Sequence, residues 1–168
     1  MTERTSVRIR PSVPGDAGYA AYMHARYYSE YHGFRDGAEY YFIKYLADFV
    51  HDPNGGRLWI AESGGVTVGS IAVVPVDGRT AQLRWFLVDK EYQNKGIGSM
   101  LIRVAIDFCK DSDIEDLFLW TFKGLDAARH LYDRAGFILT DEKRNTEWSS
   151  CEITEQKMEL RSRNVTPK

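Results

Sequence analysis

Cysteine pairs, strong net charge and long apolar runs are all missing from this 168-residue sequence, and each absence removes a class of protein. The two cysteines, Cys109 and Cys151, form no Cys-x-x-Cys pair, so the sequence offers neither a zinc site nor a disulfide framework. Lysine and arginine number 22 against 24 acidic residues, a balance that provides no broad basic field for nucleic acid. We therefore expect no metal and no nucleic-acid partner.

Membrane and export signals are missing as well. No apolar run reaches the length of about 20 residues that a membrane-spanning helix needs. The polar segment from Met1 to Arg10 lacks the apolar stretch of a signal peptide. Together with the unpaired cysteines, these absences predict a cytoplasmic protein with no membrane partner.

What remains is the composition of an ordinary globular protein, with 43% hydrophobic and 27% charged residues. We expect a single domain over residues 1–168, with its core from about 6 to 160 and a frayed tail over 161–168. Aromatic residues gather in the first third of the chain. A bulky helical core is the favoured interpretation of that cluster, and a pocket wall or a dimer face are the alternatives.

Apolar periodicity divides the chain into strands and helices. Short alternating or β-branched runs predict strands over 6–10, 57–62, 66–76, 81–88, 116–121, from 137 onward and over 153–160. Helical spacing predicts helices over 14–31, 36–50, 98–110 and 126–135. The order β-α-α-β-β-β-α-β-α-β-β predicts an α/β (α+β) domain with one mixed central sheet of six or seven strands, about four helices and a last strand that closes the sheet.

A glycine turn between the third of three consecutive strands and the next helix is the most informative feature. The strand ends near Val88, a polar loop follows, and Gly96-Ile97-Gly98 opens the helix. Backbone amides at a helix N-terminus have no helical partner, and the helix dipole adds positive potential. Glycine lets the backbone approach a ligand closely. This turn therefore predicts an anion site suited to a pyrophosphate.

Two common nucleotide motifs fail at this turn. A dinucleotide-binding Gly-x-Gly-x-x-Gly would need glycine at position 101, where the chain has Leu101, and a P-loop would need lysine after the glycine, whereas Lys95 precedes Gly96. The remaining pattern, Gln93-x-x-Gly96-x-Gly98, resembles the pyrophosphate turn of the GNAT acetyltransferases.

A second motif strengthens that resemblance. The run from Ala128 through Leu131-Tyr132 to Gly136-Phe137 is similar to a GNAT motif at the same place in the fold. The two motifs lie in the expected order and cover roughly residues 83–137. One departure is Leu125, where many relatives have an asparagine that contacts the cofactor. Asp126 or backbone groups would have to replace that contact.

The wider run from Leu119 to Arg129, with Thr154-Glu155-Gln156, resembles one GNAT subgroup. In that subgroup the acetyltransferase domain often follows a MarR-like winged-helix regulator. This chain resembles the free-standing form of the domain.

The resemblance implies a set of acetyl-CoA-binding residues. The pantetheine arm would pair like an added strand with the strand end at 86–88, where the family's two parallel strands splay. A backbone N–H near Leu87 or Val88, exposed by a bulge, would stabilise the oxyanion. The full set comprises Phe86, Leu87, Val88, Gln93, Asn94, Lys95, Gly96, Ile97, Gly98, Ser99, Asp126 and Tyr132.

The resemblance also places Tyr132 on the family's general acid. A phenol with a pKa near ~10 stays protonated at neutral pH and can donate to a leaving thiolate. Glu30 is the predicted catalytic base, and His24, His32, Tyr31 or a water chain are the alternatives. An acidic group of Glu30, Asp36 and Glu39 would favour a cationic acceptor.

The predicted function is transfer of an acetyl group from acetyl-CoA to a primary amine of a small molecule or peptide. A sensor of the same fold that binds acyl-CoA without turnover is the first alternative. A nucleotide-binding domain or scaffold unrelated to GNAT is the second. Dimers are common in the family, so a homodimer is compatible with this prediction, although no motif encodes one.

Overall fold

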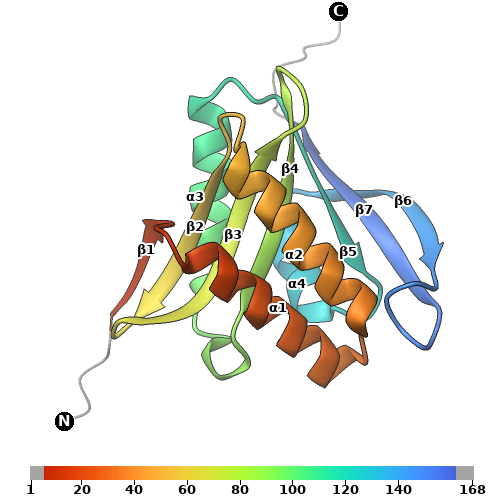
Figure 1. Ribbon diagram of the computed structural model, residues 1–168. Helices are drawn as coiled ribbons and strands as arrows, with labels where there is room; N and C mark the ends of the chain where they lie inside the picture. Colours follow the sequence, from red (N-terminus) through yellow and green to blue (C-terminus); the bar gives the residue numbers. More distant parts are fainter. Residues whose placement is uncertain (1–5, 162–168) are drawn as a thin grey trace, which may run out of the picture.

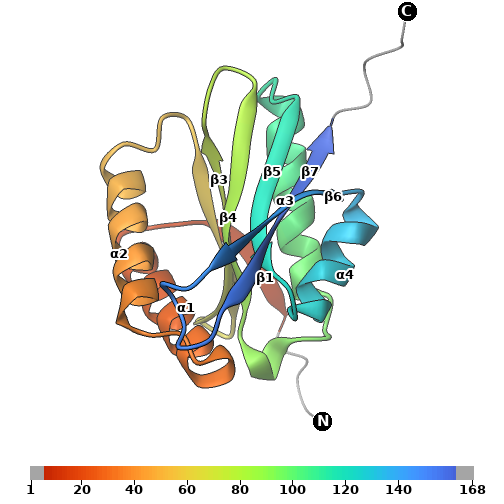
Figure 2. The same ribbon diagram turned by 90° about the vertical axis from the view of Figure 1, so that its right-hand side faces the viewer.

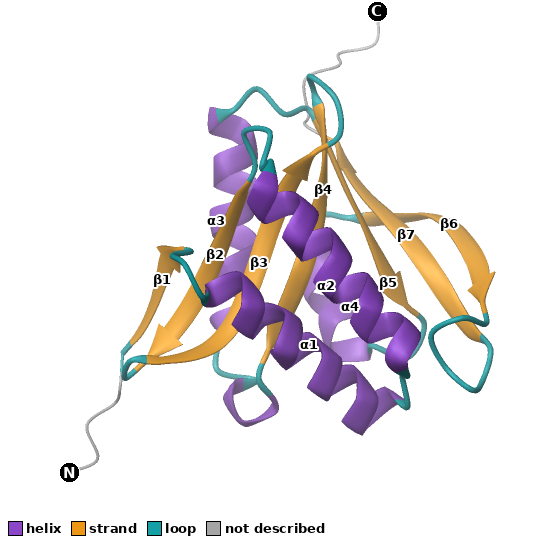
Figure 3. Ribbon diagram, viewed as in Figure 1, coloured by secondary structure: helices purple, strands orange, loops and turns teal. Residues whose placement is uncertain are grey.

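A computed structural model describes residues 6–161 and contains one seven-stranded sheet with four α-helices (Figures 1 and 3). The elements are β1 (Val7–Pro11), α1 (Asp16–His32), α2 (Asp36–His51), β2 (Arg57–Ser63), β3 (Val66–Pro75), β4 (Thr80–Val88), η1 (Lys90–Tyr92), α3 (Ile97–Asp111), β5 (Asp116–Phe122), α4 (Asp126–Ala135), β6 (Ile138–Asn145) and β7 (Ile153–Arg161). The predicted α+β class and element order are confirmed. The short 3₁₀ turn η1 was not predicted.

The sheet has the strand order β1-β2-β3-β4-β5-β7-β6. All neighbouring strands are antiparallel except β4 and β5. The prediction that the last strand closes the sheet is wrong, because β7 lies between β5 and β6. β7 carries buried residues such as Met158, whereas nearly every side chain of β6 is exposed, as suits an edge strand.

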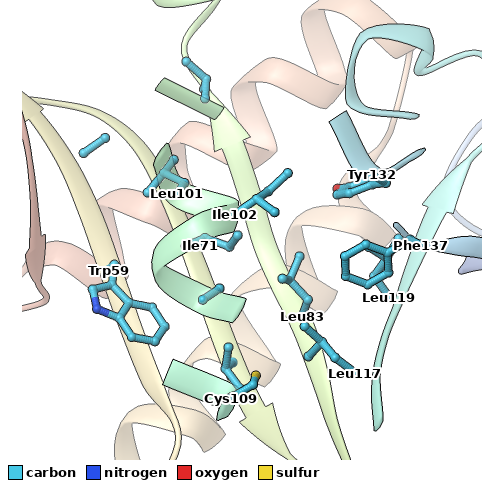
Figure 4. Close-up of a cluster of buried hydrophobic side chains, with 14 of the residues drawn as sticks. Trp59, Ile71, Leu83, Leu101, Ile102, Cys109, Leu117, Leu119, Tyr132 and Phe137 are labelled. Atoms are coloured by element: carbon cyan, nitrogen blue, oxygen red, sulfur yellow. The ribbon is translucent and has the colours of Figure 1, made fainter. Parts of the chain in front are cut away.

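Two helical layers cover the sheet. α1 and α2 lie on one face, and α3 and α4 lie on the other (Figures 1 and 2). β2 is buried on both sides, because Trp59 packs into the core beneath α3 while Ile60 packs beneath α1 and α2. Figure 4 shows the first of these cores, in which Leu101, Ile102 and Cys109 of α3 face Ile71 and Leu83 of the sheet.

The parallel pair β4 and β5 separates along its length. Backbone pairing joins only residues 80–82 of β4 to residues 116–118 of β5. Beyond that point the two strands diverge, as Figure 1 shows. Residues 83–88 of β4 therefore present a backbone edge that no neighbouring strand covers on this side.

The ends of the chain bear on two further predictions. Of the predicted frayed tail over 161–168, Arg161 ends β7 and the remaining residues lie outside the described part. No helix within residues 6–161 combines the length and apolar character needed to cross a bilayer.

Candidate active site

A β-bulge interrupts β4 where it separates from β5. Ser70 of β3 pairs with Leu87, and Ala72 pairs with Arg84, so Trp85 and Phe86 together oppose one β3 residue. Trp85 has a φ of 47°, in the left-handed region that a bulky residue rarely adopts. The fully buried Ser70 hydroxyl donates a 2.7 Å hydrogen bond to the Trp85 carbonyl oxygen and holds the bulge in place.

A pocket of about 710 Å³ lies beside the last residues of β4. The loop before α3, the first turns of α3 and α4, and the end of α1 form its walls. Nine of the residues predicted to bind the cofactor line it: Phe86, Leu87, Val88, Gln93, Asn94, Gly96, Gly98, Ser99 and Asp126. The structure therefore brings the glycine turn and the strand edge together around one pocket.

Three predicted cofactor residues do not line this pocket: Lys95, Ile97 and Tyr132, of which Tyr132 lines the smaller pocket described below. The Lys95 ammonium lies 4.9 Å from the centre of the Tyr92 ring, and Ile97 is buried in the core beneath α3. The Gln93 amide nitrogen donates a 2.9 Å hydrogen bond to the Val88 carbonyl oxygen, so that carbonyl already has a partner within the chain. Phe86 and Leu87 remain as the backbone partners on the open edge.

The start of α3 has the geometry of an anion site. Gly96 caps the helix at a φ of 83°, and the first helical bond runs from the Met100 N–H to the Gly96 carbonyl oxygen at 3.1 Å. The amides of residues 97–99 therefore precede the first helical donor and have no acceptor within the helix. A Cβ added at Gly98 would lie 2.7 Å from Leu131 Cδ1 and 3.2 Å from Phe86 Cζ, so a larger residue would displace side chains that line the pocket. The helix dipole adds positive potential at this point.

A smaller pocket of about 250 Å³ lies on the α1–α2 side of the same opening. Tyr28, Phe86, Leu125 and Ala128 line both pockets, so the two adjoin at the bulge. Aromatic side chains from several parts of the chain line the smaller pocket, among them Tyr28, Tyr41, Phe42, Trp85, Phe122 and Trp148.

Tyr132 of α4 lines the smaller pocket and is 5% exposed. Its ring centre lies 5.6 Å from that of Phe86 and 5.9 Å from that of Phe137. Figure 4 shows Tyr132 next to Phe137. Burial raises the pKa of the Tyr132 hydroxyl well above 10, and nearby Tyr28 adds to the effect. The phenol therefore stays protonated at neutral pH, as the predicted acid requires.

The structure does not bring Glu30 to Tyr132. Glu30 is exposed on α1, its carboxylate lies 3.8 Å from Arg26, and it lines a separate hollow with Asp36 and Glu39. Ala20 and Tyr28 show which face of α1 is buried, and Glu30 follows Tyr28 by two residues, about 200° around the helix. The acidic group therefore lies outside the two adjoining pockets.

His24, one of the predicted alternatives, lines the smaller pocket instead. Its Nδ1 lies 2.8 Å from the Ala20 carbonyl oxygen, and its Nε2 has no partner among residues 6–161. Burial lowers the pKa of His24 to about 4, so the imidazole is neutral at pH 7. The N–H on Nδ1 donates to Ala20, which leaves the lone pair on Nε2 free.

Several residues that line the two pockets were not predicted from the sequence. One face of α4 and its preceding loop lines the larger pocket through Gly124, Ala127, Leu131 and Arg134, a spacing of three to four residues that could have revealed them. Trp148 had no such signal. The 2.9 Å hydrogen bond from the Arg35 N–H to its carbonyl oxygen holds Trp148 in place.

Comparisons with known proteins agree with this geometry. N-acetyltransferase family 8 member 2 of Rattus norvegicus is 36% identical over 90 residues, which are 51% of this chain and 40% of that protein. N-acetyltransferase 8 of Homo sapiens is 31% identical over 100 residues, 56% of this chain and 44% of that protein. The aligned segments thus span less than half the length of these relatives. The resemblance to domains behind MarR-like regulators stays a prediction.

Solved structures share the fold. The yncA protein of Salmonella typhimurium, solved with its cofactor acetyl-CoA, superposes with a TM-score of 0.75 at 17% identity over 96% of this chain and 98% of that one. A GNAT acetyltransferase of Streptococcus pneumoniae gives a TM-score of 0.72 at 22% identity over 93% of this chain and 99% of that one. The family model for the acetyltransferase (GNAT) family matches residues 20–137, and the chain belongs to that family.

Proposed function

We propose that this protein is an N-acetyltransferase that transfers the acetyl group of acetyl-CoA to a primary amine by direct attack in a ternary complex. The observation that carries this proposal is the meeting of two pockets at the bulge of β4, with Tyr132 beside the junction. One pocket suits a pyrophosphate-bearing acyl donor, and the other suits a small acceptor.

Backbone groups of the larger pocket would make most of the contacts to the acyl donor, acetyl-CoA. The amides of residues 97–99 and the α3 dipole suit the pyrophosphate. The uncovered edge of β4 at Phe86 and Leu87 suits the amides of the pantetheine arm. When bound, acetyl-CoA supplies an activated thioester carbonyl. The chain's part is to orient that carbonyl and to move protons around it.

The buried Tyr132 hydroxyl is the proton donor in the proposed reaction. In the proposed step the neutral amine nitrogen bonds to the acetyl carbon, the carbon–sulfur bond breaks, and Tyr132 donates its phenolic proton to the leaving sulfur. The nitrogen then loses one proton to water, and water returns a proton to the Tyr132 phenolate. A backbone N–H exposed by the bulge would stabilise the oxyanion. The raised pKa of Tyr132 keeps the proton available at neutral pH.

The amine must lose a proton before it attacks. The pKa of a free amine is about 10, and burial within the smaller pocket disfavours the charged ammonium form. His24 is too weak a base to retain a proton at pH 7, so we assign it an accepting hydrogen bond. Water receives the amine proton, and the exposed Glu30 has no assigned step.

Activity and CoA binding, measured separately, test the proposal. Thiol release from acetyl-CoA is followed with a panel of amines, and CoA affinity is measured by calorimetry. Tyr132→Phe should reduce turnover by about 10²- to 10⁴-fold and leave CoA affinity unchanged. Tyr19→Phe, an exposed tyrosine of α1, is the matched control.

A non-catalytic acyl-CoA sensor is the second candidate. Leu125 favours it, because this apolar side chain stands at the start of α4, contacts both pockets and makes no capping hydrogen bond. Tight CoA binding without thiol release for any amine would support the sensor and refute the transferase. Binding of ATP or NAD with no binding of CoA would refute both.

A further inference from the structure

Arg84 is the feature of the smaller pocket that the proposed reaction does not use. It lies on β4 immediately before the bulge and is half-buried. Its guanidinium carbon lies 4.7 Å from the centre of the Tyr45 ring, 4.9 Å from that of Trp85 and 5.8 Å from that of Tyr41. Aromatic faces thus fix the position of the guanidinium, and the nearby Tyr41 hydroxyl stabilises its charge, while a guanidinium has five N–H donors in its plane and can still bind a further acceptor.

The positive charge of Arg84 has no carboxylate partner among residues 6–161. Glu155, which also lines the pocket, pairs with Lys143 at 3.3 Å. Arg10, an arginine of β1, shows the usual arrangement and pairs with Asp16 at 2.7 Å and with Glu62 at 2.9 Å. Burial lowers the pKa of Arg84, but an arginine stays charged even so. A half-buried cation without a counter-ion is stabilised when an anion binds beside it.

The pocket itself limits what can supply that anion. Its volume of about 250 Å³ suits a small molecule better than a folded partner. Aromatic side chains such as Phe42, Phe122 and Trp148 favour an apolar body. A polyamine would place a second positive charge beside Arg84. Glu155 in the pocket is already paired with Lys143, and the group of Glu30, Asp36 and Glu39 lies in a separate hollow.

We propose that Arg84 binds the carboxylate of the acceptor, and that the acceptor is a small amino acid with an apolar or aromatic side chain. A guanidinium presents parallel N–H groups that match the two oxygens of a carboxylate. The carboxylate replaces the missing counter-ion, and the side chain packs against the aromatic wall. Acetylation of this acceptor rests on the proposed function, whereas its binding beside Arg84 does not.

Matched ligands test the binding itself. The protein is saturated with CoA and titrated calorimetrically with phenylalanine, tryptophan, leucine and methionine. Each amino acid is compared with the amine that lacks its carboxylate, and spermidine represents the polyamines. At least one amino acid should bind more tightly than its matched amine by about 10- to 100-fold, the usual effect of hydrogen bonds to a charged group.

Variants of Arg84 test whether this side chain causes the preference for ligands with a carboxylate. Arg84→Gln should remove the preference for the carboxylate, and Arg84→Lys should restore part of it, because lysine keeps the charge without the planar donor pair. Arg57→Gln is the control, since the Arg57 guanidinium also lies over a ring, 5.2 Å from the centre of Phe108, but outside the pocket. Thermal unfolding of each variant confirms that it is folded.

The outcomes separate this inference from the proposed function. Carboxylate-dependent binding that Arg84→Gln removes supports the inference, even if thiol release never occurs and the proposed transferase fails. Equal binding or equal acetylation of acids and matched amines, unchanged in Arg84→Gln, overturns the inference while the transferase stands. Preferential binding of spermidine, or no binding by any of these ligands, overturns it as well.

Discussion

Mild acid is expected to destabilise the fold through His24, the neutral imidazole buried beneath the α1–α2 layer. Its pKa is about 4 in the folded protein, against 6.5 for an unperturbed histidine. Between these values the unfolded chain binds a proton that the folded protein does not. The stabilisation is therefore complete above pH 6.5 and is lost as the pH falls toward 4. The shift corresponds to about 3 kcal/mol in total, of which about 2 kcal/mol is already lost at pH 5.

This loss is large beside a typical unfolding free energy of about 5–15 kcal/mol, so urea unfolding will resolve it. Tryptophan fluorescence at pH 7.5 and pH 5 gives the free energy of unfolding at each pH. His24→Phe should reduce the difference between the two by about 2 kcal/mol, because phenylalanine cannot bind a proton. His51→Asn is the control, since His51 is exposed at the end of α2.

His32, whose pKa burial lowers with a contribution from Lys90, adds a loss of the same sign. That contribution persists in His24→Phe, so the comparison with the unmodified chain isolates His24. An equal loss of stability in the unmodified protein and in His24→Phe would refute the reasoning.

Two further substitutions test the architecture of the donor side. Gly98→Ala should weaken CoA binding in calorimetry, because the new Cβ would lie 2.7 Å from Leu131 Cδ1 and 3.2 Å from Phe86 Cζ and would displace these pocket-lining side chains. Gly78→Ala, where the added atom meets open space, should bind CoA normally. Ser70→Ala should lower the free energy of unfolding by about 1–3 kcal/mol in urea, because the Trp85 carbonyl oxygen loses its buried donor. Unchanged CoA affinity in the first variant, or unchanged stability in the second, would contradict these accounts.

Local signals explain why the helices could be predicted well. α4 spans Asp126–Ala135 as expected, and it ends at Gly136, whose φ of 98° is a conformation that glycine adopts readily. A glycine also marks the boundary of α3, which begins directly after Gly96. In each case the determining residue lies within one turn of the boundary, so no long-range contact is needed to place it.

The candidate site was harder to predict, because it depends more on contacts between residues that are distant in the sequence. The glycine turn was predicted because its amides and glycines are consecutive, and the structure places most of its residues around the larger pocket. Glu30 was misplaced because tyrosines surround α1 on several sides and obscure the buried face that His24 and Tyr28 mark. Neither the insertion of β7 beside β5 nor the bulge at Trp85 has a local signal, since Trp85 stands where a glycine would have marked the turn.

The link between the α1–α2 connection and the segment before β7 has a consequence for how this fold can diversify. Phe34 forms an isolated bridge with Ser149, and these residues join two segments that are distant in sequence on the acceptor side. The donor pocket, in contrast, is formed mainly by β4, α3 and α4. We therefore expect a change of backbone around Phe34 to need a matching change around Ser149, which lies next to Trp148 of the smaller pocket, with little effect on the donor pocket. A single exchange would break their mutual contact, so the two segments should change as a pair.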